Sequence, residues 1–215
     1  MSSVFKKFLF FCCCPVIFLQ ANAQENIQNL YNKKLYFQGY SGGMTFHTGY
    51  LSGGKFNMPD SQEKIDIQGT PFGIGGLLRF HFGKHLRIGG EGYSSTLHYG
   101  KSESYMTFGW GGLLIDSQWK IKKCTLFFGG TIGGGSVKNI VVLNAVSPHS
   151  IEKNALYRKY TVMVADPFVG MEYALTRRIC LITKVDYLVN ITGKQADFAT
   201  GPRVYAGIVF FHAIK

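Results

Sequence analysis

Apolar and polar residues alternate through residues 71–95, and the rest of the chain repeats this pattern. One face of the first half carries Phe72, Ile74, Gly76, Leu78, Phe80 and Phe82. The other face carries Gly73, Gly75, Arg79 and His81, with Leu77 as its one apolar member. A period of two is typical of a β-strand with one apolar and one polar side. A polar break at 83–85 then reverses the chain into a second alternating strand.

The same alternation recurs in eight segments. We expect strands at residues 35–51, 67–83, 85–99, 105–121, 124–142, 160–176, 179–191 and 200–214. The links alternate between long and short, and the longest are polar loops expected at 52–66 and 143–159. Pro71, Pro167 and Pro202 fall on returning strands, where each removes a backbone donor and predicts a β-bulge. An even strand count with long loops at one end and tight turns at the other is typical of bacterial outer-membrane barrels.

The chemistry of the two faces distinguishes a membrane barrel from a soluble one. Apolar faces are rich in Phe, Ile and Leu, whereas polar faces carry Gly, Arg and Glu. A soluble lipocalin-like carrier needs an apolar interior, but polar faces of this kind suit a lumen and the apolar faces suit lipid. The sequence therefore predicts an all-β fold, an eight-stranded antiparallel up-and-down transmembrane β-barrel over residues 35–215.

The N-terminus has the pattern of a signal peptide. Lys6 and Lys7 precede an apolar run at 8–19, and Ala21–Asn22–Ala23 forms an A-x-A cleavage site. The apolar run is too short to cross a bilayer as a helix, which favours cleavage over anchoring. We expect a signal peptide at 1–23, a periplasmic lead at 24–34, and export to the bacterial outer membrane.

Ten charged residues fall on the predicted polar faces. They are Arg79, Arg87, Glu91, Asp116, Lys120, Asp166, Glu172, Lys184, Asp186 and Arg203, five cations and five anions. An eight-stranded barrel is just wide enough for side chains to fill it. Buried charges must be paired, because unpaired ones cost several kcal/mol each. The sequence predicts a salt-bridged network that plugs the lumen and has a structural rather than a catalytic role.

The remaining basic residues account for the formal net charge of +11, and their positions do not indicate nucleic-acid binding. Those at turns and termini are Lys33, Lys34, Lys84, Lys122, Lys123, Arg177, Arg178 and Lys215. Aromatic residues are not interleaved with this set, so nucleic-acid binding is not supported. A basic rim at the periplasmic end instead suits anionic lipid headgroups or another outer-membrane or periplasmic protein.

Few motifs indicate chemistry. Cys124 and Cys180 fall on opposite faces, which argues against a disulfide, and no Cys/His spacing supports zinc. No glycine pair precedes a helix pattern, so no phosphate loop, and no other cofactor site, is expected. Ser94 and His98 share an outward face, and a lipid-A-modifying barrel hydrolase would use such a pair. That enzyme is retained as an alternative, whereas the main hypothesis is not an enzyme.

The A-x-A signal, the eight segments, the short basic turns and the end GPRVYAGIVFF at 201–211 resemble small outer-membrane barrels of the OmpA/OmpX-like class. The segments GYSGG, PFGIGG and DPFVG are similar to Bacteroidetes-type outer-membrane barrels. The resemblance implies roles in envelope integrity, adhesion or complex assembly, and it carries over no catalytic residue. We expect a structural or interaction protein that acts through its extracellular loops or outer wall. A narrow porin-like channel is the alternative.

Overall fold

Eight antiparallel strands form the barrel. The computed structural model describes residues 36–57, 64–100, 104–147, 150–193 and 195–213, so the predicted signal peptide and lead lie outside the described residues. The barrel strands are β1 (Phe37–Gly49), β4 (Phe72–Phe82), β5 (Leu86–Tyr99), β6 (Ser104–Ile121), β7 (Cys124–Ser147), β8 (Ser150–Ala174), β9 (Ile179–Asn190) and β10 (Gly201–Ala213).

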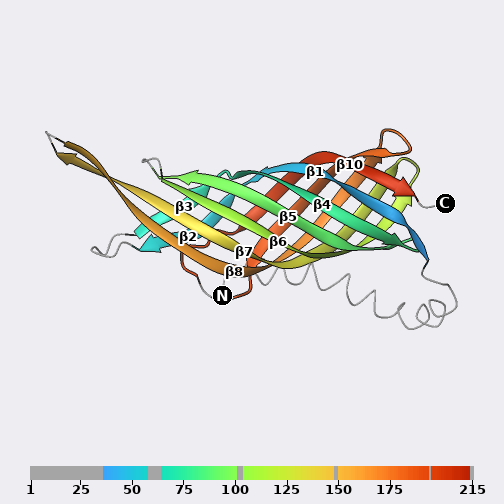
Figure 1. Ribbon diagram of the computed structural model, residues 1–215, viewed down its shortest axis with the longest axis horizontal. Helices are drawn as coiled ribbons and strands as arrows, with labels where there is room; N and C mark the ends of the chain where they lie inside the picture. Colours follow the sequence, from blue (N-terminus) through green and yellow to red (C-terminus); the bar gives the residue numbers. More distant parts are fainter. Residues whose placement is uncertain (1–35, 58–63, 101–103, 148–149, 194, 214–215) are drawn as a thin grey trace, which may run out of the picture. The chain divides into compact units, whose positions relative to one another are not determined.

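Each barrel strand pairs with its neighbours along the chain, and β1 closes the ring by pairing with both β10 and β4 (Figure 1). A closed ring leaves no unpaired sheet edge around its wall. The predicted eight-stranded antiparallel fold is confirmed. In the part of the chain that the structure describes, no helix is long and apolar enough to cross a membrane. We call the end with the short links the turn end and the opposite end the loop end.

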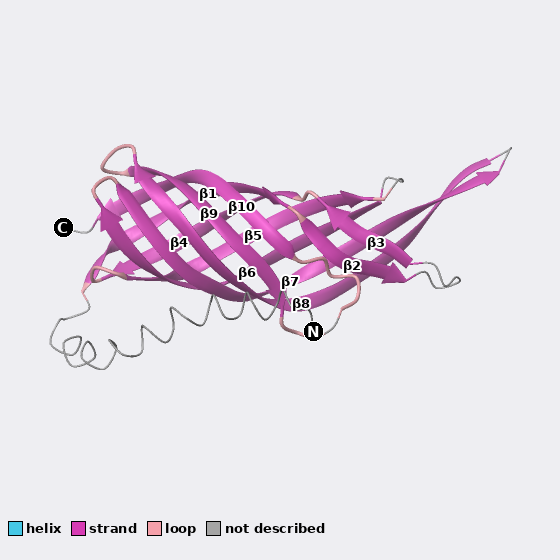
Figure 2. Ribbon diagram, turned by 180° about the vertical axis from the view of Figure 1, so that it is seen from behind, coloured by secondary structure: helices cyan, strands magenta, loops and turns pink. Residues whose placement is uncertain are grey.

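The predicted loop at 143–159 is wrong, because most of it is strand. β7 and β8 stay paired as far as Ser147 and Ser150. Their far ends project beyond the other strands at the loop end (Figures 1 and 2). Beyond the barrel wall neither face of this two-stranded ribbon needs to be apolar. The ribbon therefore lacks the alternation of apolar and polar residues that predicts strands, although its two strands remain paired through their backbones.

The predicted loop at 52–66 also contains strands, β2 (Leu51–Asn57) and β3 (Lys64–Gly69), which form a separate antiparallel sheet. β2 is tied to the last link, since the backbone N of Lys55 lies 2.6 Å from the carbonyl O of Ala196. Apolar side chains of this hairpin and of the link share one buried core with the loop-end half of the lumen. Its hairpin and link members are Leu51, Phe56, Ile67, Phe198 and Ala199.

The bulges predicted at the three prolines are not found. Pro71 precedes β4, and the β9–β10 register is continuous through Pro202. The β8–β9 pairing skips Asp166 and Pro167 of β8 and then resumes in the same register. The missing proline donor is thus accommodated by an unbonded position rather than by an extra residue. In the described ladders, register shifts occur only between Phe37 and Gly39 and in the β2–β3 sheet.

The two faces of the wall have opposite chemistry. The outer face of the barrel is apolar, with Phe72, Leu113 and Ile132 exposed by 65 %, 74 % and 61 %. Toward the loop end the outer face of β7 and β8 becomes polar, as at Lys138 and Lys159. The strands therefore extend past an apolar band, as their length relative to a bilayer requires.

Glycine is required on the inner face of the wall much more than on the outer face. A Cβ added at inward-facing Gly43 would lie 2.0 Å from the carbonyl O of Ile208 and 2.7 Å from the Cα of Val209. At outward-facing Gly134 the nearest atom, the carbonyl O of Val162, would be 3.7 Å away, an ordinary contact. Close approach of backbone, rather than chain flexibility, accounts for the inward glycine.

We predict that Gly43→Ala lowers the free energy of unfolding by about 1–3 kcal/mol, the usual cost of overpacking a rigid site. Gly134→Ala is the matched control and should change it by less than about 0.5 kcal/mol. Urea unfolding of the folded barrel in detergent measures both. Equal effects of the two substitutions would contradict the assignment of inner and outer faces.

Candidate functional site in the barrel lumen

Two layers of ion pairs cross the lumen. The layer nearer the turn end joins Arg79 of β4, Arg87 of β5, Asp116 of β6 and Glu172 of β8. Arg87 binds Asp116 through two hydrogen bonds, Nε to Oδ1 at 2.5 Å and Nη2 to Oδ2 at 3.0 Å. Glu172 Oε1 accepts from Nη1 of Arg79 at 2.5 Å and from Nη1 of Arg87 at 2.8 Å. Four strands are therefore joined by charge-assisted bonds.

An aromatic ring completes this first layer. The guanidinium carbons of Arg79 and Arg87 each lie 4.8 Å from the centroid of the Phe127 ring. Phe127 itself is almost completely buried. A ring face attracts cations, so Phe127 reduces the repulsion between two guanidinium groups that share Glu172. Phe127 is not among the residues that the sequence analysis singles out, because hydrophobic alternation gives no signal for this contact.

The second layer, nearer the loop end, is centred on Lys184 of β9 and Arg203 of β10. Arg203 binds Asp186 through two hydrogen bonds of 2.9 and 2.8 Å and Asp166 through one of 3.2 Å. Lys184 Nζ lies 3.0 Å from Glu91 Oε2 and 3.7 Å from carboxylate oxygens of both Asp166 and Asp186. All five side chains are buried.

Aromatic and hydroxyl groups surround the second layer. Lys184 Nζ lies 4.4 to 5.0 Å from the ring centroids of Tyr205, Phe168 and Tyr93. Glu91 also accepts hydrogen bonds from the hydroxyls of Tyr93 at 2.9 Å and Thr131 at 2.6 Å. The layer has three carboxylates for two cations, and these hydroxyls disperse part of the extra negative charge. Sequence reasoning missed all of these neutral partners.

Nine of the ten predicted lumen charges lie in these two layers. The exception is Lys120, which is exposed near the end of β6. It is one residue from the strand end, where the lumen widens toward solvent. The two strongest pairs, Arg87 with Asp116 and Arg203 with Asp186, are directly opposite on neighbouring strands. Hydrophobic alternation predicts which face of the wall each residue occupies. Only the register between neighbouring strands shows which residue is its partner.

A small polar cluster at the loop end fell outside the sequence predictions. Asp197, in the last link, accepts from Asn139 Nδ2 at 2.7 Å and lies 3.5 Å from Arg158 Nη1. Burial, followed by the Asp197 carboxylate, raises the pKa of Tyr99 to about 12 and raises that of Tyr160 further. Both hydroxyls therefore stay protonated at neutral pH. The cluster holds the link against β7 and β8 beyond the apolar band.

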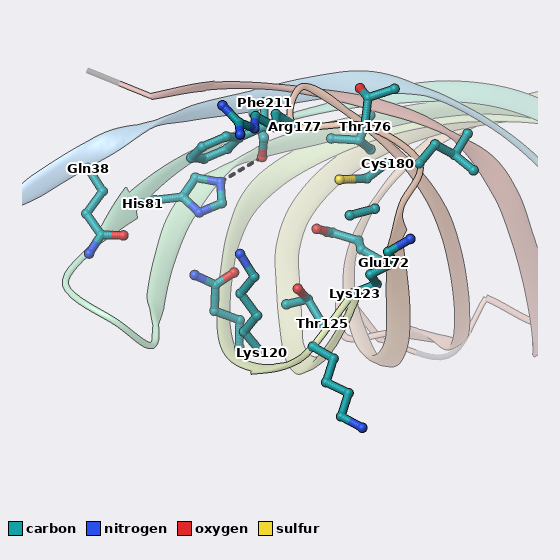
Figure 3. A pocket seen from close by; sticks show the side chains of 16 residues that line it. Gln38, His81, Lys120, Lys123, Thr125, Glu172, Thr176, Arg177, Cys180 and Phe211 are labelled. Carbon is teal, nitrogen blue, oxygen red and sulfur yellow. Dashed lines mark hydrogen bonds between the residues drawn. The ribbon is translucent and has the colours of Figure 1, made fainter. Parts of the chain in front are cut away.

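The turn end of the lumen opens into a cavity of about 450 Å³, which we call the vestibule. Four basic side chains line it, Lys120, Lys122, Lys123 and Arg177. Figure 3 shows Lys120, Thr125 and Glu172 directed into this space. Glu172 forms part of its floor, and its carboxylate is already bonded to Arg79 and Arg87.

The hydrolase arrangement considered from the sequence is not formed. Ser94 and His98 are four residues apart on β5, which separates them by about 13 Å along an extended strand. His98 instead packs on Tyr105, with ring centroids 5.9 Å apart. Cys124 and Cys180 are free thiols, as expected from their opposite faces. Among the described residues no group of three or more His, Cys, Asp or Glu could hold a metal ion.

Comparison with known proteins identifies the fold. No protein-family model matches the sequence, and no curated protein matches it either. Among solved structures, OprG from Pseudomonas aeruginosa matches with a TM-score of 0.52 at 11 % identity, over 83 % of this chain and 98 % of OprG. Neisserial surface protein A matches with a TM-score of 0.50 at 12 % identity, over 80 % of this chain and 95 % of that protein. Both are surface or outer-membrane proteins by description.

A third structure, the attachment invasion locus protein Ail of Yersinia pestis, matches at 15 % identity with a TM-score of 0.49, over 81 % of this chain and 99 % of Ail. The similarities to OprG and Neisserial surface protein A confirm the predicted resemblance to small outer-membrane barrels at the level of the fold. The narrower resemblance to Bacteroidetes-type barrels stays a prediction.

We predict that Arg87→Met lowers the free energy of unfolding by about 3–5 kcal/mol, because it leaves the buried Asp116 carboxylate without its two-bond partner. The double variant Arg87→Met/Asp116→Leu removes both charges and should regain at least half of that loss. Lys120→Met, at the exposed position, should cost less than about 1 kcal/mol. Urea unfolding measures all three. A loss of less than about 1 kcal/mol in the free energy of unfolding for Arg87→Met alone would contradict the buried network.

Proposed function

We propose that this chain is an integral protein of the bacterial outer membrane. The observation that supports this most directly is the polarity of the wall, with apolar side chains such as Leu113 and Ile132 exposed and Arg79, Arg87 and Arg203 fully buried. Water-soluble barrels have the opposite arrangement, since their interiors are apolar. Placement of the turn end in the periplasm follows the general rule that periplasmic links are short.

We further propose that the lumen is closed and does not conduct. Three barriers stand in series along it, the two ion-pair layers and the apolar core at the loop end. The core includes Phe56 and Ile67 of the β2–β3 hairpin and Phe198 of the last link. Large side chains such as Tyr205 and Phe127 fill the lumen beside the ion pairs. This favours a structural or interaction protein over the narrow channel.

The proposed mode of action is contact through the loop end. The β7–β8 ribbon extends past the strands that flank it, because β6 begins at Ser104 and β9 ends at Asn190. Tyr157 lies at the base of the ribbon, because it pairs with Ile140 and Ile140 pairs with Tyr105 near the start of β6. It is 60 % exposed, and an exposed aromatic residue where a ribbon projects suits recognition of another macromolecule. Among the residues that the structure describes, no group in the lumen or on the wall has the arrangement of an enzyme active site, and we propose a non-enzymatic role.

Purified full-length barrel in planar lipid bilayers should show no stable conductance steps. Replacing residues 52–68 by a short Gly-Ser linker removes the hairpin part of the loop-end core but leaves both ion-pair layers. That variant should also remain silent. Replacing Arg203 and Tyr205 of one layer and Arg87 and Phe127 of the other by alanine in addition opens both ion-pair layers and should give open steps. Steady conductance of the unaltered protein would refute the closed lumen and support a channel.

A photo-crosslinking amino acid at Tyr157 should capture a protein or polysaccharide on intact cells in their native setting. The same group at Leu113, which is 74 % exposed in the apolar band, is the matched control and should capture lipid only. Mass spectrometry of the crosslinked species distinguishes these products. Lipid adducts at both positions, with no macromolecule at Tyr157, would refute action through the ribbon.

A further inference from the structure

The vestibule is a basic cavity, and its described lining residues do not neutralise its charge. Lys120, Lys122, Lys123 and Arg177 line it, and Glu172 is the one acidic side chain among the lining residues that the structure describes. Glu172 contributes little negative potential, because Arg79 and Arg87 bind the same carboxylate oxygen at 2.5 and 2.8 Å. The described vestibule therefore has an excess of positive charge inside a narrow, low-dielectric wall, which concentrates the field on its opening.

The floor and sides also provide neutral hydrogen-bonding groups. Ser41 Oγ and His81 Nε2 lie 2.8 Å apart at one side, and Gln118 and Thr125 line another. A volume of about 450 Å³ falls within the range of about 300–1,000 Å³ that is usual for small-molecule sites. Basic groups around the opening and polar groups within it together favour a compact, multiply charged anion.

The backbone at Lys122 gives an independent reason to assign a role to this charge. Lys122 has a φ of 57°, and in the described chain it is the only residue other than glycine with a positive φ. That conformation favours glycine or asparagine, and a lysine there costs stability. The two-residue turn between Ile121 and Cys124 would form more easily with glycine at position 122, so folding alone does not account for the lysine.

We propose that the vestibule binds a soluble anion that carries two or more phosphate or carboxylate groups. The ligand comes from the aqueous compartment that the turn end faces. The lysines and Arg177 hold its charged groups at the opening, and Gln118 and Thr125 hydrogen-bond the part that enters. This inference goes beyond the proposed function and does not depend on what the β7–β8 ribbon contacts.

The full chain in phosphatidylcholine nanodiscs provides the test, with inorganic tripolyphosphate and citrate as probes in isothermal titration calorimetry. The variant Lys120→Gln/Lys123→Gln should weaken binding at least tenfold. Lys84→Gln/Arg178→Gln is the matched control, since it removes two charges from the same end at positions that do not line the vestibule. The control should weaken binding less than twofold. Equal weakening would mean diffuse attraction to the basic rim and would overturn the site.

Two further arms separate the remaining explanations. Lys122→Gly should raise the urea midpoint of unfolding while weakening tripolyphosphate binding several-fold, a combination that loss of structure cannot produce. Unchanged binding would remove Lys122 from the site. The chain in nanodiscs that contain phosphatidylglycerol should bind the probe as tightly as the chain in nanodiscs without it. Competition by that lipid would assign the vestibule to headgroups instead of a soluble anion, and failure of both probes to bind the unaltered protein would overturn the proposal.

Discussion

Pairing of buried charges across the lumen is the interaction on which the rest of this structure depends. A barrel that is apolar outside must place its polar residues inside, where the space is narrow and water is scarce. Charges can remain there only when each finds a partner. Arg87 with Asp116 and Arg203 with Asp186 do so across neighbouring strands. Glu172 joins the first pair to Arg79, and Lys184 joins the second pair to Glu91. The same bonds hold the wall together, and we propose that they also close the lumen.

The amphipathic strands could be predicted because each has one face toward lipid and one toward the lumen. Phe72 and Ile74 on one face and Arg79 on the other are enough to identify β4 as such a strand. The β7–β8 ribbon could not be predicted in this way, because it leaves the barrel wall and loses the contrast between faces. Hydrophobic alternation reports burial, so it is silent where backbone pairing alone maintains a strand.

The sequence predicts most of the charged residues of the candidate site, but it does not predict how they pair. Alternation assigned nine buried charges to the lumen, yet Lys120 differs from them only by its position beside a turn. The aromatic contacts of Phe127 and Tyr205 and the hydroxyl of Thr131 depend on which residues face one another across the barrel. Sequence spacing within a strand contains no such information. For the same reason the pairing of Asp197 with Asn139 appears only once the last link is placed against β7.

The orientation of the wall can be tested directly through its two tryptophans. Trp119 stacks on exposed Phe128 with ring centroids 4.8 Å apart, whereas Trp110 is buried in the lumen beside Arg203. Single-tryptophan variants, Trp110→Phe and Trp119→Phe, can be placed in bilayers of brominated phospholipid and their fluorescence compared with that in ordinary lipid. The account predicts strong quenching of Trp119 and little quenching of Trp110. Quenching of Trp110 with Trp119 unaffected would contradict it.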